Sequence, residues 1–235
     1  DTAFELMAHG INLHRTQILE SEDLKKTIDE DREIIDFDMD ALYENKVKVL
    51  YSAIIDFISR SQSSLPSDFA EELYRFRHAA GDIVECVKHI KHFRKNATTY
   101  LVSDNEYIRG EYNKIRFRLA SILREIYRLR ESRETETETE TVLELFGLDE
   151  FKLEMEQSRN KLNLDIDALL LDQSITPHMA TSLLNDYGYA EDTAWNLVNV
   201  AHAMLASHDA LVAEAEQAVT LDREEIEELA RSDAA

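Results

Sequence analysis

Residues 175–199, ITPHMATSLLNDYGYAEDTAWNLVN, decide the fold of this chain because they form the pattern of one long amphipathic helix. Thr176 is a suitable N-cap, and Pro177 suits the first helical turn, where its missing N–H is not needed. Asp186 falls inside the apolar stripe, where a carboxylate needs a hydrogen bond, a cation or a metal. The stripe recurs at three- and four-residue steps and consists of Met179, Leu183, Tyr187, Ala190, Ala194, Leu197, Ala201 and Met204.

The composition of the whole chain also favours long helices. Of its 235 residues 44% are hydrophobic, but only 5 are Gly and 2 are Pro. Helix breakers are therefore rare, while the apolar content suffices for a core. No run of about 18 apolar residues is present, so we expect no membrane span within these residues. The chain has no initiator Met or signal peptide and opens within an amphipathic pattern, so we interpret it as a piece of a longer protein.

Apolar periodicity predicts six long amphipathic helices and no strand, and the short joins between them are typical of an antiparallel all-α bundle. We expect three helices in residues 1–100, three similar helices in residues 101–207, and an acidic helical or disordered tail in residues 208–235. The run ETETETET, 134–141, should be a connection that is either flexible or partly helical. The helices are expected at about 4–20, 41–60, 69–96, 104–133, 142–172 and 176–207, with an acidic connector at 22–40.

Two details of these helices can be checked against a structure. The single cysteine, Cys86, excludes an internal disulfide, fits a reducing compartment and is interpreted as a small helix residue. The helix expected at 41–60 should turn one apolar face inward. That face consists of Tyr43, Val47, Leu50, Tyr51, Ile54 and Ile58.

The charge of the chain argues against nucleic acid as a partner. The formal net charge is −22, and binding to a phosphate backbone needs the opposite sign. Residues 75–133 are nevertheless basic, with 14 basic and 7 acidic side chains. Four arginines cluster on one face of the helix expected at 104–133, and they either pair with acidic neighbours across the bundle or meet an anionic surface such as lipid headgroups. They are Arg109, Arg116, Arg124 and Arg130.

A second polar face lies on the helix expected at 69–96. His78, Asp82, Glu85 and His89 are spaced i, i+4, i+7 and i+11, so they line up on one side of a helix. These residue types can bind a divalent metal, although an ordinary solvated helix face explains the same pattern. The eight histidines of the chain are otherwise scattered and no glycine-rich phosphate loop is present, so we do not expect an enzyme.

Two segments resemble a known family. The segment ITPHMATSLLNDYGYAEDTAWNLV resembles the cytoplasmic tail of bacterial Na+/phosphate cotransporter proteins, and FRHAAGDIVECVKHIKHFRKN, 76–96, resembles the matching helix of its first half. That tail is similar to PhoU, the phosphate-uptake regulator, which is built from two three-helix bundles. The resemblance covers about residues 1–207 and implies two PhoU-like three-helix bundles.

The resemblance also implies a function. The chain would be a non-catalytic regulatory domain of a sodium-dependent phosphate symporter, at the cytoplasmic face of the bacterial inner membrane, and would modulate phosphate transport. Its partners would be the transmembrane transport domain of the same polypeptide and an anionic membrane surface, and formation of a homo-oligomer is left open. The alternative is a free-standing, PhoU-type metal-binding regulator of phosphate uptake or signalling.

PhoU repeats carry an acidic residue, three further residues and then Asp, and they can bind iron or zinc clusters. Asp82 and Asp186 match the second position of that motif, whereas His78 and Ser182 stand at the first. Histidine is a competent ligand and serine is a poor one. No cofactor is therefore certain, and the candidate ligands for iron, zinc, manganese or nickel are His78, Asp82, Glu85, His89 and Asp186.

Overall fold

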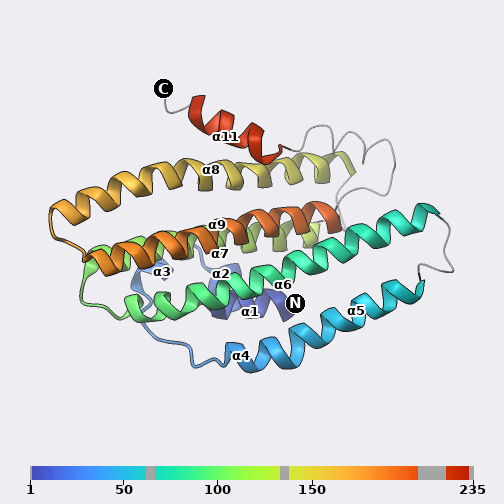
Figure 1. Cartoon of the computed structure of the whole chain (residues 1–235), viewed down its shortest axis with the longest axis horizontal. Coiled ribbons are helices and arrows are strands. Elements are labelled where there is room, and N and C mark those ends of the chain that lie inside the picture. The colour runs from blue at the N-terminus through green and yellow to red at the C-terminus, as the bar shows by residue number, and fades with distance from the viewer. Residues whose placement is uncertain (1, 62–66, 133–137, 206–220, 233–235) are drawn as a thin grey trace.

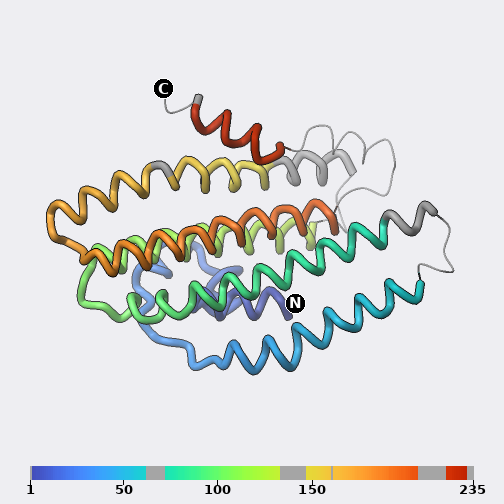
Figure 2. The backbone as a smooth tube through the Cα atoms, viewed as in Figure 1, coloured from blue at the N-terminus to red at the C-terminus, as the bar shows by residue number. Residues whose placement is uncertain are grey.

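The computed structural model describes residues 2–61, 67–132, 138–205 and 221–232, and every regular element within these ranges is a helix (Figure 1). The predicted all-α bundle is thus confirmed. Figure 2 traces the same path along the chain. The helices are α1 (Thr2–Gly10), α2 (Arg15–Glu20), α3 (Leu24–Glu30), α4 (Met39–Leu42), α5 (Lys48–Ser61), α6 (Ser67–Leu101), α7 (Glu106–Ser132), α8 (Glu138–Leu171), α9 (Pro177–Leu205) and α11 (Arg223–Ser232).

Helix α9 contains most of residues 175–199. It is the centre of the bundle and packs against α6, α7 and α8 (Figure 1). Its start is capped as predicted, because the backbone N–H of Met179 donates to Thr176 Oγ1 at 3.2 Å. Most of the predicted stripe is buried, although Met204 at its end is exposed. Residues outside the stripe, such as Ala180 and Val198, are buried too, because three helices surround α9.

The hydrophobic core is continuous across residue 100, where the sequence suggested a boundary between two halves. One cluster of buried apolar side chains extends from Leu6 in α1 to Leu197 in α9. Helices α6 and α9, which fall in different predicted halves, pack against each other along this core. The internal repeat itself stays a prediction. Among the described residues, no helix is both long and apolar enough to cross a membrane.

The first predicted helix, at 4–20, is divided into α1 and α2 by a turn at Asn12. Asn12 has a φ of 59°, a conformation that asparagine tolerates better than most residues. Its side chain is bonded to distant backbone, donating to the carbonyl of Glu33 at 2.8 Å and accepting from the N–H of Ile35 at 2.9 Å. These long-range bonds stabilise the break, which local periodicity does not reveal. The acidic connector expected at 22–40 contains α3.

Arginine side chains fasten the N-terminal helices to the bundle. Arg116 of α7 donates to the backbone carbonyls of Ile11, Asn12 and Ile28 and pairs with Asp31 at 2.9 Å. Arg124 donates to the carbonyls of Ile18 and Ser21, and Arg94 of α6 to those of His9 and Ile35. Carbonyls at the ends of helices lack partners within the helix and carry partial negative charge, so cations stabilise them.

This arrangement bears on the two interpretations of the arginine cluster and excludes the surface interpretation for Arg116. Arg116 does pair with an acidic neighbour, but it is only 1% exposed, so the surface interpretation is wrong for it. Arg124 binds carbonyl oxygens rather than a carboxylate. Arg109 likewise donates to the carbonyl of Ser103 at 2.5 Å. Arg130 is exposed and pairs with its chain neighbour Glu131.

The predicted inward face of the helix at 41–60 is only half buried. Tyr43, Val47 and Ile58 are buried as expected, whereas Leu50 and Ile54 are exposed. A π-helical turn, Tyr43–Val47, precedes α5. After this turn Leu50, Tyr51 and Ile54 still line one pocket against α6, and that pocket is open. Of the described helices, α6 is the one that packs along α5 (Figure 1).

The structure describes only part of the residues for which a tail and a connection were predicted. Within the predicted tail, α11 is helical and packs against α8 (Figure 1). Residues 206–220 and 233–235 lie outside the described residues. Of the run ETETETET, residues 138–141 belong to α8 and 134–137 lie outside the described residues.

Candidate functional site

The polar face predicted on α6 remains mostly a solvated helix face. His78 is exposed, and its ring lies 4.4 Å from that of Tyr74. Glu85 pairs with Lys88 at 2.6 Å. Asp82 is half-buried, and burial raises the pKa of its carboxyl although His78 opposes the shift. His89 lies further along α6, where its ring is 5.7 Å from that of Tyr189 in α9.

Asp186 of α9 lies deep inside the helix interface, and its partner is a tyrosine. The hydroxyl of Tyr112 in α7 donates to Asp186 Oδ2 at 2.5 Å, and both side chains are buried. Burial raises the pKa of Asp186, whereas the hydrogen bond from Tyr112 lowers it. The same contact and burial raise the pKa of Tyr112. The hydrogen bond that the sequence required of this carboxylate is therefore present.

Aromatic rings surround this pair between α6, α7 and α9. Tyr100 stacks on Tyr112 with ring centroids 5.0 Å apart, and His92 stacks on Tyr189 at 5.1 Å. Sequence reasoning missed both Tyr112 and His92. Tyr112 could have been found, because it lies one helical turn from Ile108, an apolar residue of the helix expected at 104–133. His92 could not have been found, because its stacking on Tyr189 depends on which helix packs against α6.

The five candidate metal ligands do not converge. Asp186 faces Tyr112, while the other four lie along α6, and Glu85 is engaged by Lys88. Among the described residues, no group of three or more His, Cys, Asp or Glu side chains is arranged to hold a metal ion. A protein site for zinc or iron normally needs at least three such ligands. In this arrangement the five residues do not fit the metal site that the resemblance implies. Metal binding stays a prediction, which elemental analysis of protein purified without chelators would test.

Cys86 has a structural role, as the sequence indicated. Its side chain is completely buried, and Sγ donates to the carbonyl of Thr193 in α9 at 3.7 Å. Burial raises the pKa of the thiol, which disfavours the reactive thiolate.

Glu191 is a further buried acid on α9 that the sequence analysis did not select. It is 2% exposed and accepts a hydrogen bond from Arg159 Nη1 at 3.1 Å. Burial, supported by the neighbouring carboxyl of Glu156, raises the pKa of Glu191 to about 7. Since this pKa is above the unfolded value of 4.5, Glu191 contributes stability below pH 4.5 and loses that contribution as the pH rises through 7.

We therefore expect Glu191→Gln to flatten the pH dependence of stability. Between pH 4.5 and 8 the wild type should lose on the order of 1–2 kcal/mol more than the variant, a value reduced for solvent screening around Arg159. Urea unfolding at several pH values measures this difference. Glu150→Gln, at an exposed position of α8, should follow the wild type. Parallel pH profiles for wild type and Glu191→Gln would contradict the assignment.

The apolar surface of α5 is the second candidate site. Val49, Leu50, Ile54 and Phe57 are 59%, 53%, 39% and 64% exposed. Beside them lies an open pocket of about 280 Å³ between α5 and α6. Its walls are almost entirely apolar and include Thr2 and Ala3 at the start of α1. Contiguous apolar surface of this kind usually marks a contact site.

Comparison with known proteins adds no identification. Neither the family models, the curated proteins nor the solved structures contain a match to this chain. The resemblance to the phosphate cotransporter family therefore depends only on the sequence segments quoted above.

Proposed function

We propose that this chain is a non-catalytic regulatory domain of a sodium-dependent phosphate symporter and that it docks onto the transport domain through α5. The observation that carries the proposal is the exposed apolar face, Val49, Leu50, Ile54 and Phe57. Covering the exposed surface of these four large apolar side chains would stabilise a contact. The sequence resemblance supplies the identity of the partner.

The position of the N-terminal helix supports a partner in the same polypeptide. Thr2 and Ala3 line the apolar pocket beside α5. Residues that precede Asp1 in the intact protein would therefore leave the bundle next to the exposed face. A short covalent connection raises the local concentration of the partner to the millimolar range, which favours docking even through a modest surface.

The buried acids support a regulatory rather than a catalytic role. Asp186 and Glu191 carry raised pKa values, but each contacts a neighbouring helix: Asp186 is bonded to Tyr112 and Glu191 to Arg159. Both contacts hold α9 in place.

The proposed location of the domain is the cytoplasmic face of the bacterial inner membrane.

The first test is the nucleotide sequence upstream of this chain. The proposal requires that the intact reading frame encode several apolar spans of about 20 residues before Asp1. A reading frame that begins directly before Asp1 would refute the symporter proposal.

The second test is phosphate uptake by the intact protein. We expect Phe57→Glu to leave the helical content unchanged, because the side chain is exposed, and to alter sodium-dependent uptake by disrupting docking. A charge placed in an apolar contact should weaken docking at least about tenfold. Leu171→Glu is the matched control, because Leu171 is also an exposed apolar side chain (84%) but lies at the C-terminal end of α8 and not on α5. Equal uptake by Phe57→Glu and Leu171→Glu would place the functional contact elsewhere.

A further inference from the structure

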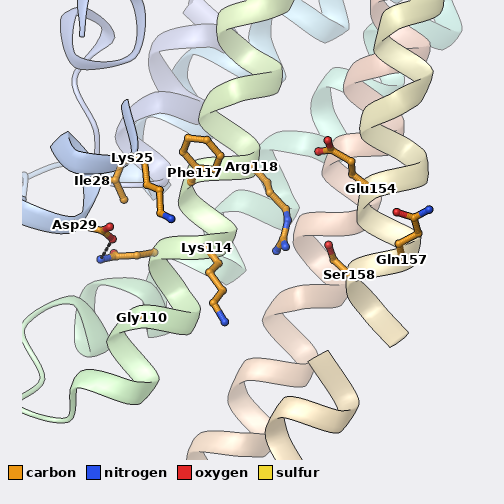
Figure 3. Close-up of a pocket in the computed structure, with 11 residues that line it drawn as sticks. Lys25, Ile28, Asp29, Gly110, Lys114, Phe117, Arg118, Glu154, Gln157 and Ser158 are labelled. Atoms are coloured by element: carbon orange, nitrogen blue, oxygen red, sulfur yellow. Dashed lines mark hydrogen bonds between the residues drawn. The ribbon is translucent and has the colours of Figure 1, made fainter. Parts of the chain in front are cut away.

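Two adjoining cavities form a groove between α7 and α8, on the side of α7 that α3 also covers, and Figure 3 shows the larger of them. Their volumes are about 340 Å³ and 200 Å³. They share Lys114 and Arg118 of α7 and Ser158 of α8, so these three side chains form the centre of the groove. This groove is separate from the α5 face.

The residues that line the groove include four cations and four carboxylates. Lys25 of α3 lines its larger part and Lys161 of α8 its smaller part, in addition to Lys114 and Arg118. Each of these cations is a receptor for anionic oxygen, and the arginine fork suits phosphate in particular.

The most informative cation is Arg118. It is half-buried at the shared centre of the groove, and it forms no hydrogen bond or ion pair within the part of the chain that the structure describes. The whole chain has 48 acidic side chains for 26 basic ones, so an arginine without a carboxylate is unexpected. Figure 3 shows its guanidinium extending into the space between α7 and α8, on the side of the Ser158 hydroxyl.

The carboxylates are those of Asp29, Glu111, Glu154 and Asp165, and all but Glu154 have a partner given below. Glu111 pairs with Lys114 at 2.6 Å, and Asp29 accepts a hydrogen bond from the amide of Asn113 at 3.2 Å. Asp165 lies 3.9 Å from Lys114. Lys114 is therefore shared between two carboxylates, whereas Arg118 has no hydrogen-bond or ion-pair partner among the described residues.

The larger cavity has an apolar wall beside these cations. Ile28 of α3 and Phe117 of α7 contribute that wall (Figure 3). A volume of about 340 Å³ exceeds the requirement of an inorganic ion and lies at the lower end of small-molecule sites. The groove therefore combines an anion receptor with space for an organic group.

We propose that this groove binds a small phosphorylated organic compound. The phosphate is held by Arg118, Lys114 and Ser158, and the organic part lies against Phe117 and Ile28. This inference goes beyond the regulatory function proposed above and does not depend on it, because the groove, its charge and its wall are all contained in this chain.

Calorimetric titration of the 235-residue chain tests the proposal, with phenyl phosphate and inorganic phosphate as probes. We expect saturable binding of phenyl phosphate, and weaker binding of inorganic phosphate because it lacks the apolar contact. Binding should weaken as the pH falls below about 6, where a phosphate monoester loses its second charge. The absence of saturable binding of phenyl phosphate would overturn the proposal.

Variants locate the site. Arg118→Gln should weaken the binding of phenyl phosphate at least about tenfold, since a charge-assisted contact contributes about 1.5–3 kcal/mol. Arg128→Gln is the matched control on the same helix, because Arg128 is exposed and pairs with Glu125. Circular dichroism of both variants verifies folding. Equal affinities for Arg118→Gln and Arg128→Gln would exclude the groove as the site.

Lipid vesicles distinguish the source of the phosphate group. We expect phenyl phosphate to bind in the absence of any lipid. Retention of the chain on vesicles that contain phosphatidic acid, without saturable binding of phenyl phosphate, would assign the groove to a lipid headgroup and overturn the proposal of a soluble ligand.

Discussion

Replacing Arg116 by Met should lower the free energy of unfolding by about 3–5 kcal/mol, the usual cost of breaking a buried charged network. Arg116 is 1% exposed and donates to three backbone carbonyls as well as to Asp31. Methionine fills similar volume but donates nothing, so these oxygens would remain buried without a donor. Urea unfolding followed by circular dichroism measures the loss.

Further measurements separate this network from a general effect of losing an arginine. Arg128→Met, at an exposed position of the same helix, should change stability by no more than about 0.5 kcal/mol. Hydrogen exchange in Arg116→Met should accelerate first in α1, α2 and α3, which the arginines hold against α7. Arg116→Lys should recover only part of the loss, because one ammonium cannot reproduce the guanidinium fork. A loss below about 1 kcal/mol in Arg116→Met would show that the network contributes little.

Gly10→Ala should also destabilise the chain, although alanine is the better helix former. A Cβ at residue 10 would lie 2.0 Å from Cγ2 of Ile90, a side chain that is 1% exposed in the core. Overpacking of this kind costs about 1–3 kcal/mol, which exceeds the gain of about 1 kcal/mol in helix propensity. The midpoint of urea unfolding should therefore fall.

The physical cause of this effect can be tested with a second substitution. Ile90→Leu removes the methyl group on Cβ, so Gly10→Ala should be less destabilising in that background, and the double-mutant cycle measures the coupling. Gly110→Ala is the matched control, because its added Cβ would meet nothing within 4 Å, and it should be neutral or stabilising. If Gly10→Ala stabilises the chain, α1 does not pack against α6 as closely as described.

The apolar face of α5 is the place where the predicted burial was partly wrong. Periodicity placed Leu50 and Ile54 inward, yet both are exposed, at an open pocket between α5 and α6. Apolar periodicity indicates that one face of a helix will be buried against another surface. It does not report whether the cover is another part of the same chain or a partner.

The candidate site was predictable only where local signals were sufficient. Asp186 was correctly selected as a buried carboxylate because it interrupts an apolar stripe, and Cys86 was correctly expected to be structural. The partner of Asp186, Tyr112, is 74 residues away in the sequence. The alignment of His78, Asp82, Glu85 and His89 on one face was a property of the helix alone, and it could not predict convergence with a second helix.

The sequence by itself determined that the chain is all-α, where α6, α7, α8 and α9 lie, and which face of α9 is buried, because helix periodicity and capping act over three to four residues. The packing of the helices sets three further features: α9 has three neighbours, Arg116 binds backbone carbonyls about 100 residues away, and Arg118 lines a groove, where it has no ion-pair partner among the described residues. These features depend on which helices meet and in what register. Long-range packing decides that choice, and no local pattern records it.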